Sequence, residues 1–161
     1  MGAIIHILEA NQAPVRANDL ELLAFGNYGH YTSMQVRAGQ VRGLDLHLVR
    51  LDANAEALFG CPPGAGRVLQ ALQHAVPAAD CSVRVTLFSR ELRRVVAGEE
   101  VEPDILVSVT PPAVSDASAM KVIPVRYDRE MPHVKHLATY GLLRERRLAK
   151  RAGFDDALFV N

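Results

Sequence analysis

The sequence predicts an α+β protein: an N-terminal two-layer domain of sheet and helices, followed by the beginning of a second, β-rich domain. Short runs of alternating or continuous apolar residues bounded by turn residues indicate strands, and two segments with apolar residues at helical spacing indicate helices. Strands dominate before a stretch rich in Pro, Ser and Ala at 111–119, and a β-α-β order follows it. We therefore expect a domain at 1–110, a linker at 111–119 and an incomplete domain at 120–161.

The first domain is expected to contain four strands, at 4–8, 32–38, 82–88 and 104–110. The strand at 32–38 ends in a turn at Gly39-Gln40, and Pro111-Pro112 ends the strand at 104–110. The segment 82–88 alternates, so that every second side chain lies on one face.

Two helices are expected between these strands. The helix at 45–59 has an apolar stripe, and Gly60 with Pro62-Pro63 ends it. The second helix, at 67–76, ends at Pro77. The stripe of the first helix is formed by Leu44, Leu48, Leu51, Ala55 and Leu58.

After the linker the pattern predicts a strand at 120–126, a loop that holds Met131-Pro132, a helix at 138–152 and a strand at 156–160. A segment of this size does not readily close a core of its own. We expect either that it belongs to a longer polypeptide or that another element covers the edge of its last strand.

Composition excludes several classes of protein. Lys+Arg and Asp+Glu both number 18, so the net charge is zero, which argues against binding nucleic acid or anionic membrane through bulk charge. No apolar run approaches the roughly 20 residues of a membrane helix, and the N-terminus lacks the pattern of a signal peptide. The two cysteines, Cys61 and Cys81, are too few for a disulfide framework. We expect a cytoplasmic protein with no nucleic-acid or membrane partner.

Two cations are candidate functional residues. Lys135 stands where a loop meets a helix, with Val134 and Leu137 close by, and is either a solvated lysine or a desolvated amine that attacks carbonyl groups. Arg50 lies away from the apolar stripe of its helix, and is either solvated or a bidentate phosphate ligand. Spacing alone leaves these alternatives open.

Other groups of charged or polar residues do not indicate a functional site. His133 and His136 lack a third ligand at a suitable spacing, so no metal site is predicted. The basic run at 144–151 is interpreted as a solvated helix face, with a nucleic-acid patch as a distant alternative. Asp155-Asp156 is interpreted as a turn, and no Gly-rich phosphate loop or nucleophile motif occurs.

Two motifs together resemble a known family. The string GHYTSMQVRAGQVRGLDLHLVRLDANAEALFG, at 29–60, contains His-x-x-Arg-Leu from His47 to Leu51. A second segment has Pro-His-Val-Lys ending at Lys135, then Tyr140, then a helix followed by Gly-Phe-Asp-Asp-Ala-Leu. In this order and spacing they resemble class IV (fold type IV) pyridoxal-phosphate enzymes, which include branched-chain and D-amino-acid aminotransferases, (R)-selective amine transaminases and aminodeoxychorismate lyase.

The resemblance implies roles for four residues. Lys135 would form the internal aldimine with pyridoxal 5'-phosphate and then move the proton between the substrate and the cofactor. Arg50 would bind the cofactor phosphate, Tyr140 would contact the cofactor near its phenolic oxygen, and Tyr31 would line the substrate pocket. The linker would be the interdomain connection, and the enzyme would be a homodimer whose sites borrow residues from the partner.

The implied function is pyridoxal-phosphate-dependent transamination of an amino acid or amine. The alternatives are an elimination of the aminodeoxychorismate lyase type with the same cofactor, or a truncated, non-catalytic relative that binds phosphate or dimerises. The family's glutamate that pairs with the pyridine nitrogen, and its Gly/Thr phosphate loops, would follow Asn161. We therefore expect that the 161 residues alone do not complete a catalytic cycle.

Overall fold

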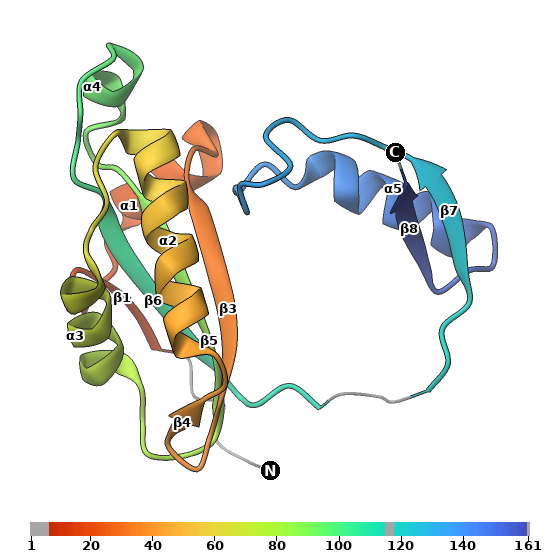
Figure 1. The fold of residues 1–161 in the computed structure, drawn as a ribbon, viewed down its shortest axis with the longest axis horizontal. Helices are drawn as coiled ribbons and strands as arrows, with labels where there is room; N and C mark the ends of the chain where they lie inside the picture. Colours follow the sequence, from red (N-terminus) through yellow and green to blue (C-terminus); the bar gives the residue numbers. More distant parts are fainter. Residues whose placement is uncertain (1–6, 115–117, 161) are drawn as a thin grey trace. The chain divides into compact units, whose positions relative to one another are not determined.

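The computed structural model describes residues 7–114 and 118–160, which form two compact units. The first unit comprises Met1–Ala113 with Lys135–Leu137, and the second comprises Val114–Val134 with Ala138–Asn161 (Figure 1). Most of the strand predicted at 4–8 and the centre of the linker predicted at 111–119 lie outside the described residues. Within the described ranges, none of the helices has both the length and the apolar composition needed to cross a bilayer.

The first unit is built on a six-stranded antiparallel sheet with the strand order β2-β1-β6-β5-β3-β4. The central strands β3, β5 and β6 have the β-branched, alternating sequences that favour a sheet with one buried face. The strands are β1 (Ile7–Ala10), β2 (Ala13–Pro14), β3 (His30–Arg37), β4 (Gln40–Val41), β5 (Cys81–Phe88) and β6 (Asp104–Thr110).

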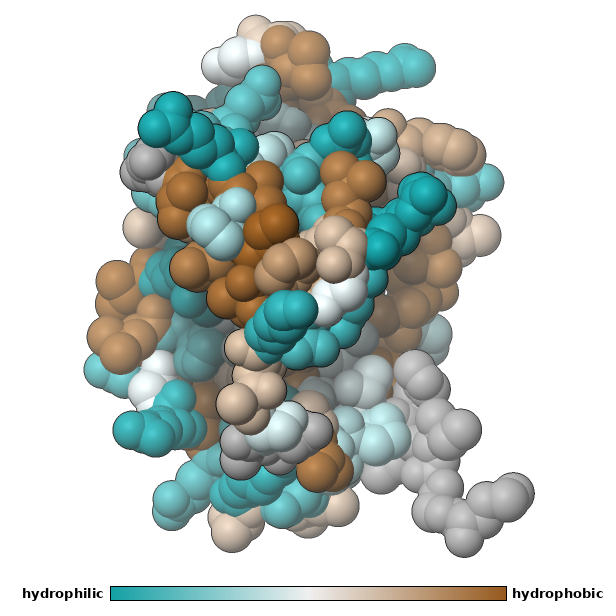
Figure 2. Space-filling view, turned by 90° about the vertical axis from the view of Figure 1, so that its right-hand side faces the viewer, coloured by the Kyte–Doolittle hydropathy of each residue, from teal (hydrophilic) through white to brown (hydrophobic). Residues whose placement is uncertain are grey.

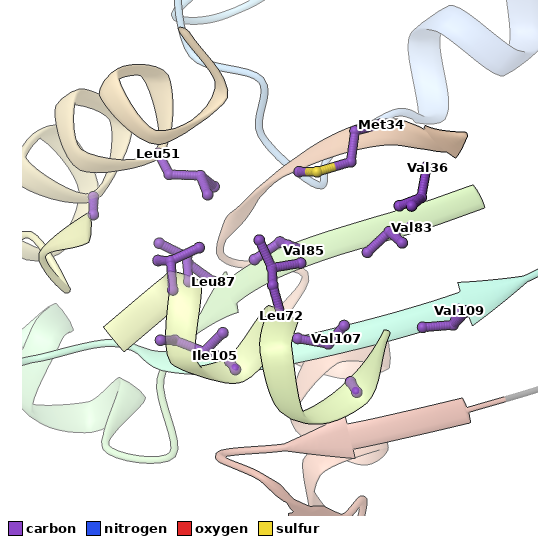
Figure 3. Close-up of a cluster of buried hydrophobic side chains, with 14 of the residues drawn as sticks. Met34, Val36, Leu51, Leu72, Val83, Val85, Leu87, Ile105, Val107 and Val109 are labelled. Carbon is purple, nitrogen blue, oxygen red and sulfur yellow. The ribbon is translucent and has the colours of Figure 1, made fainter. Parts of the chain in front are cut away.

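The core lies between this sheet and two helices, α2 (Leu44–Phe59) and α3 (Ala65–Ala75), which cover one of its faces (Figure 1). The side chains of β5, β6 and both helices converge there (Figure 3). Val85 and Leu87 of β5 are fully buried, as are Leu51 and Ala55 of the predicted helical stripe. Burying each large aliphatic side chain contributes about 1.5–3 kcal/mol, so this layer supplies much of the stability of the unit.

The observed bounds of α2, α3, β3, β5 and β6 agree with the predicted segments to within about two residues. Periodicity did not predict three short helical segments: α1 (Ala17–Glu21), the π-helical turn η1 (Leu22–Gly26) and α4 (Leu92–Val96). Five residues are too few to show a repeat. A distant contact anchors α1, because Arg90 donates from Nε and Nη2 to the two carboxylate oxygens of Asp19 at 2.7 and 2.9 Å.

The second unit contains β7 (Val122–Arg126), α5 (Tyr140–Arg151) and β8 (Asp156–Val160). These elements confirm the predicted β-α-β order, and β7 and β8 pair in parallel. Gly141 in α5 lies directly under the Tyr127 hydroxyl, which leaves no room for a Cβ atom. The sheet formed by β7 and β8 exposes apolar side chains, among them Leu158 (53% exposed). Figure 2 shows apolar side chains gathered on the side of the molecule that it views. The exposed apolar side chains of the sheet offer surface for packing against another element.

Candidate active site

Lys135 is attached to the first unit through its backbone. The Tyr31 amide donates to the Lys135 carbonyl at 3.0 Å, and the Leu137 amide donates to the Gly29 carbonyl at 2.9 Å. This segment therefore pairs antiparallel with the beginning of β3. Gly29 has φ +148°, and a Cβ atom there would overlap the Leu87 carbonyl oxygen, so the close approach of the chains requires glycine.

The Lys135 amine lies over an aromatic ring that a second cation also contacts. The Nζ atom is 4.8 Å from the centroid of the Tyr31 ring, and Cζ of Arg84, on β5, is 3.6 Å from the same centroid. Both distances are within the range of cation–π interactions. The structure thus brings the predicted Lys135 and Tyr31 together and adds Arg84, which sequence reasoning did not single out.

Arg50 projects from α2 toward β3, where two polar side chains hold its guanidinium group. Its Nη2 atom donates to Oγ1 of Thr32 and lies 3.2 Å from Nδ1 of His47. Oγ1 of Thr32 is 2.6 Å from the same His47 nitrogen. A guanidinium group only donates, so Nδ1 is the acceptor, and the Thr32 hydroxyl accepts from Arg50 and donates to His47.

The Arg50 guanidinium retains capacity for a ligand. Its Nε atom is buried without a hydrogen-bond partner, and the side chain forms no ion pair with any carboxylate in the described ranges. It lines a cavity of about 390 Å³ together with Arg42, Gly43, Leu46 and His47. An unpaired guanidinium at the edge of a cavity can bind an oxyanion through a bidentate, charge-assisted hydrogen bond.

Both histidines near Arg50 favour the neutral form. Burial, and secondarily the Arg50 charge, lowers the pKa of His47. The same causes, in the same order, lower the pKa of His30 to about 4. Neutral imidazole at position 47 is the form that can accept a hydrogen bond from Arg50. His30 is fully buried, and neither of its ring nitrogens has a partner in the part of the chain that the structure describes.

The four sequence-predicted residues are divided between the two units. Lys135, Tyr31 and Arg50 belong to the first unit, whereas Tyr140 begins α5 of the second unit and is 78% exposed. Thr32 was missed, because a threonine in a strand has no distinguishing pattern. His47 stands three residues before Arg50 in the same helix, and this spacing does indicate that the two side chains are neighbours.

Residues 29–161 match the model of a protein family described as amino-transferase class IV. The match covers most of the chain, and the chain therefore belongs to this family. The resemblance noted in the two sequence motifs is confirmed. A comparison with curated protein sequences finds no match.

Solved structures of aminotransferases share the fold. A hypothetical aminotransferase from Mycobacterium tuberculosis, in its PLP-bound form, superposes over 97% of this chain with a TM-score of 0.70 and 21% identity. A fold IV transaminase from Curtobacterium pusillum superposes over 97% of this chain with a TM-score of 0.67 and 22% identity. A branched-chain aminotransferase from Thermoproteus uzoniensis superposes over 99% of this chain with a TM-score of 0.68 and 14% identity. The chain spans 62%, 64% and 60% of these three proteins. The likeness establishes the fold and confirms the predicted α+β class.

Proposed function

We propose that the protein is a pyridoxal-phosphate-dependent transaminase in which Lys135 holds the cofactor and Arg50 binds its phosphate. The observation that carries the proposal is the Arg50 guanidinium, which Thr32 and His47 fix in place while its buried Nε atom stays without a partner. Pyridoxal phosphate supplies an aldehyde that condenses with amines and a ring that takes up electrons when a bond at the substrate Cα breaks.

Each residue has a distinct role in this proposal. Arg50 offers a charge-assisted hydrogen bond to the phosphate dianion, and the neutral His47 accepts a hydrogen bond that orients the guanidinium. Lys135 provides a primary amine that binds the cofactor and later carries a proton to and from the substrate. Backbone pairing with β3 holds the lysine beside the Tyr31 ring, which would line the substrate pocket.

Further parts of the proposal rest on the family resemblance. Tyr140 would contact the cofactor near its phenolic oxygen, and the enzyme would be a homodimer with domains at 1–110 and 120–161 joined at 111–119. Both cysteines are unpaired, which supports a reducing compartment such as the cytoplasm. An elimination of the aminodeoxychorismate lyase type is the alternative reaction, since it needs the same lysine and cofactor. A non-catalytic relative that binds phosphate is the second alternative.

The test is covalent trapping of the cofactor. The chain has only three lysines, Lys121, Lys135 and Lys150, so a borohydride-reduced adduct can be mapped by mass spectrometry without ambiguity. We expect one adduct, on Lys135, that disappears in Lys135→Ala and persists in Lys150→Ala. Labelling spread over all three lysines, or none at all, would refute the role of Lys135.

The phosphate site is tested with pyridoxal, which lacks the phosphate. Arg50→Gln should weaken trapping of pyridoxal phosphate about 10- to 100-fold, the effect of losing a hydrogen bond to a charged group, and leave trapping of pyridoxal unchanged. Arg42→Gln is the matched control, because Arg42 is exposed at the edge of the same cavity. Equal losses for both aldehydes in Arg50→Gln would contradict phosphate binding by Arg50.

A further inference from the structure

An apolar groove of about 480 Å³ lies where the end of β3, β4 and the second half of α3 meet. All the residues that line it belong to the first unit. The most deeply buried of them are Met34 and Val36 of β3 and Leu72 of α3, which are members of the core (Figure 3). The groove therefore extends from the core of this unit to its surface.

The lining of the groove suits an uncharged ligand. Among the described residues that form it, none carries a charge, and the Gln73 amide is the one side chain that forms strong hydrogen bonds. Taking an ionised group out of water into such a lining would be costly. Gly39, Gln73 and Ala78 are exposed, so a molecule can enter from solvent.

The size of the groove is that of a ligand site. Pockets that hold small molecules measure about 300–1,000 Å³, and an apolar cavity of about 150 Å³ is enough to bind benzene. The groove has about three times the latter volume. It can therefore hold a molecule with an apolar body and one hydrogen-bonding group.

A single turn of the chain separates this groove from the Arg50 cavity. Val41 and Leu44 line the groove, whereas Arg42 and Gly43, which lie between them in the chain, line the Arg50 cavity. The turn at 41–44 is thus a wall that the two sites share. A molecule that packs against one side of this turn stabilises the arrangement of the other side.

The same turn is bonded to a residue that holds Arg50. The Gly43 carbonyl accepts a hydrogen bond from the His47 amide at 3.2 Å, and Nδ1 of His47 lies 3.2 Å from Nη2 of Arg50. On the strand side, Met34 follows Thr32 by two residues, so both side chains lie on the same face of β3. A ligand in the groove would therefore contact neighbours of both residues that fix the guanidinium.

We propose that this groove is an effector site for an uncharged, apolar small molecule, and that its occupancy strengthens anion binding at Arg50. Occupancy of two coupled sites changes their affinities reciprocally. The existence of the groove site is independent of the transaminase proposal, whereas its effect on Arg50 rests on the proposed role of Arg50 as a phosphate ligand.

The first experiment uses 1-hexanol as the probe and needs no cofactor. The chain has four methionines, of which Met34 lines the groove and Met120 and Met131 belong to the second unit. In a chain labelled with ¹³C at the methionine methyl groups, the Met34 signal is identified by its loss in Met34→Leu. Hexanol should shift this signal in a saturable manner and leave the Met120 and Met131 signals in place.

The chemistry of the probe tests the chemistry of the site. From butanol to hexanol, each added methylene group should tighten binding about fourfold, because it buries more apolar surface. Hexanoate has the same length but carries a charge, so it should leave the Met34 signal unshifted. Equal affinities for hexanol and hexanoate would overturn the assignment to uncharged molecules.

Two variants place the probe in the groove. Ala78→Trp puts an indole ring at the exposed rim and should weaken hexanol binding more than tenfold. Ala79→Trp is the matched control, because Ala79 is the next residue of the same exposed loop and does not line the groove. Equal hexanol affinities in the two variants would overturn the location of the site.

The second experiment measures the coupling to Arg50 with inorganic phosphate as the probe. The Nε–Hε signal of Arg50, identified by its loss in Arg50→Gln, is titrated with phosphate with and without saturating hexanol. Hexanol should lower the dissociation constant of phosphate about fivefold, which is at the low end of typical coupling between two sites. The effect should persist in Ala79→Trp and be absent in Ala78→Trp.

The outcomes separate this inference from the proposed function. A Met34 signal that hexanol does not shift, or that moves with protein concentration because a second copy of the chain covers the groove, would overturn the site. Saturable hexanol binding that leaves the phosphate affinity unchanged would overturn the effector role. Neither readout involves Lys135, so failure to trap an adduct on Lys135 would refute the transaminase proposal and leave the groove site standing.

Discussion

Replacing Thr32 by valine tests how the site holds Arg50. The Thr32 hydroxyl is fully buried between β3 and α2, where it accepts a hydrogen bond from Arg50 and donates one to His47 at 2.6 Å. Valine has nearly the same shape but no hydroxyl, so Thr32→Val removes both hydrogen bonds and leaves the packing in place.

The expected loss of stability follows from these two bonds. A hydrogen bond to a charged group contributes about 1.5–3 kcal/mol and a neutral one about 0.5–1.5 kcal/mol. The Arg50 side chain is partly exposed, and its Nη2 atom still lies 3.2 Å from the His47 nitrogen, so part of the loss is recovered. We expect the free energy of unfolding to fall by about 2 kcal/mol. Release of the guanidinium should also weaken pyridoxal phosphate binding about tenfold, or about 1.4 kcal/mol.

Urea unfolding followed by circular dichroism measures the first effect, and a spectroscopic titration measures the second. With a typical slope of about 2 kcal/mol per molar urea, the midpoint should shift by about 1 M. Thr110→Val is the matched control, since the Thr110 hydroxyl on β6 has no side-chain hydrogen bond among the described residues. Identical midpoints and affinities for the two variants would refute the network of Thr32, His47 and Arg50.

Three further predictions concern stability. Burial lowers the pKa of His30 to about 4, so between pH 6.5 and 4 the unfolded chain binds more protons than the folded chain. The free energy of unfolding therefore falls as the pH drops through this window. His30→Leu should remove roughly 3 kcal/mol of that fall, which urea midpoints at several pH values would measure. Asp19 is 2% exposed and bonded to Arg90, so Asp19→Asn should cost about 3 kcal/mol by thermal unfolding at pH 7, and a cost below about 1 kcal/mol would contradict this. The hydrogen bonds from Arg90 lower the pKa of Asp19, so this contribution is present above pH 3.8 and is lost at more acidic pH. Gly141→Ala should reduce the protection of the α5 amides from hydrogen exchange, because the added methyl group overlaps the Tyr127 hydroxyl. Gly66→Ala in α3 is the control: its methyl group meets open space, so the free energy of unfolding should be unchanged or rise by up to about 1 kcal/mol.

Local pattern was sufficient to predict the long elements. The apolar stripe of α2 and the alternation in β5 each extend over eight or more residues, so the period is visible in the sequence. The short α1 shows no period, and the contact that anchors it joins Arg90 to Asp19 across 71 positions. Local sequence pattern cannot predict a contact between residues so far apart in the chain.

Some residues of the candidate site could be predicted from the sequence, and others could not. Lys135 and Arg50 were found because two motifs resemble those of a family, and the family is confirmed by the match over 29–161. Arg84 carries no such signal, since an arginine that points outward from an alternating strand is usually solvated. The register of β5 against β3 placed it beside Tyr31.

The sequence by itself determined the α+β class, the bounds of the periodic elements, the family and the identity of the candidate lysine and arginine. The reason is that periodicity and motif are properties of residues close together in the chain. Only the tertiary structure decided which side chains meet: Thr32 with Arg50 and His47, Lys135 with Tyr31, and Arg84 with the same Tyr31 ring. Strand order and register fix these contacts, because a shift of one residue would turn Arg84 from the sheet face opposite the helices into the core.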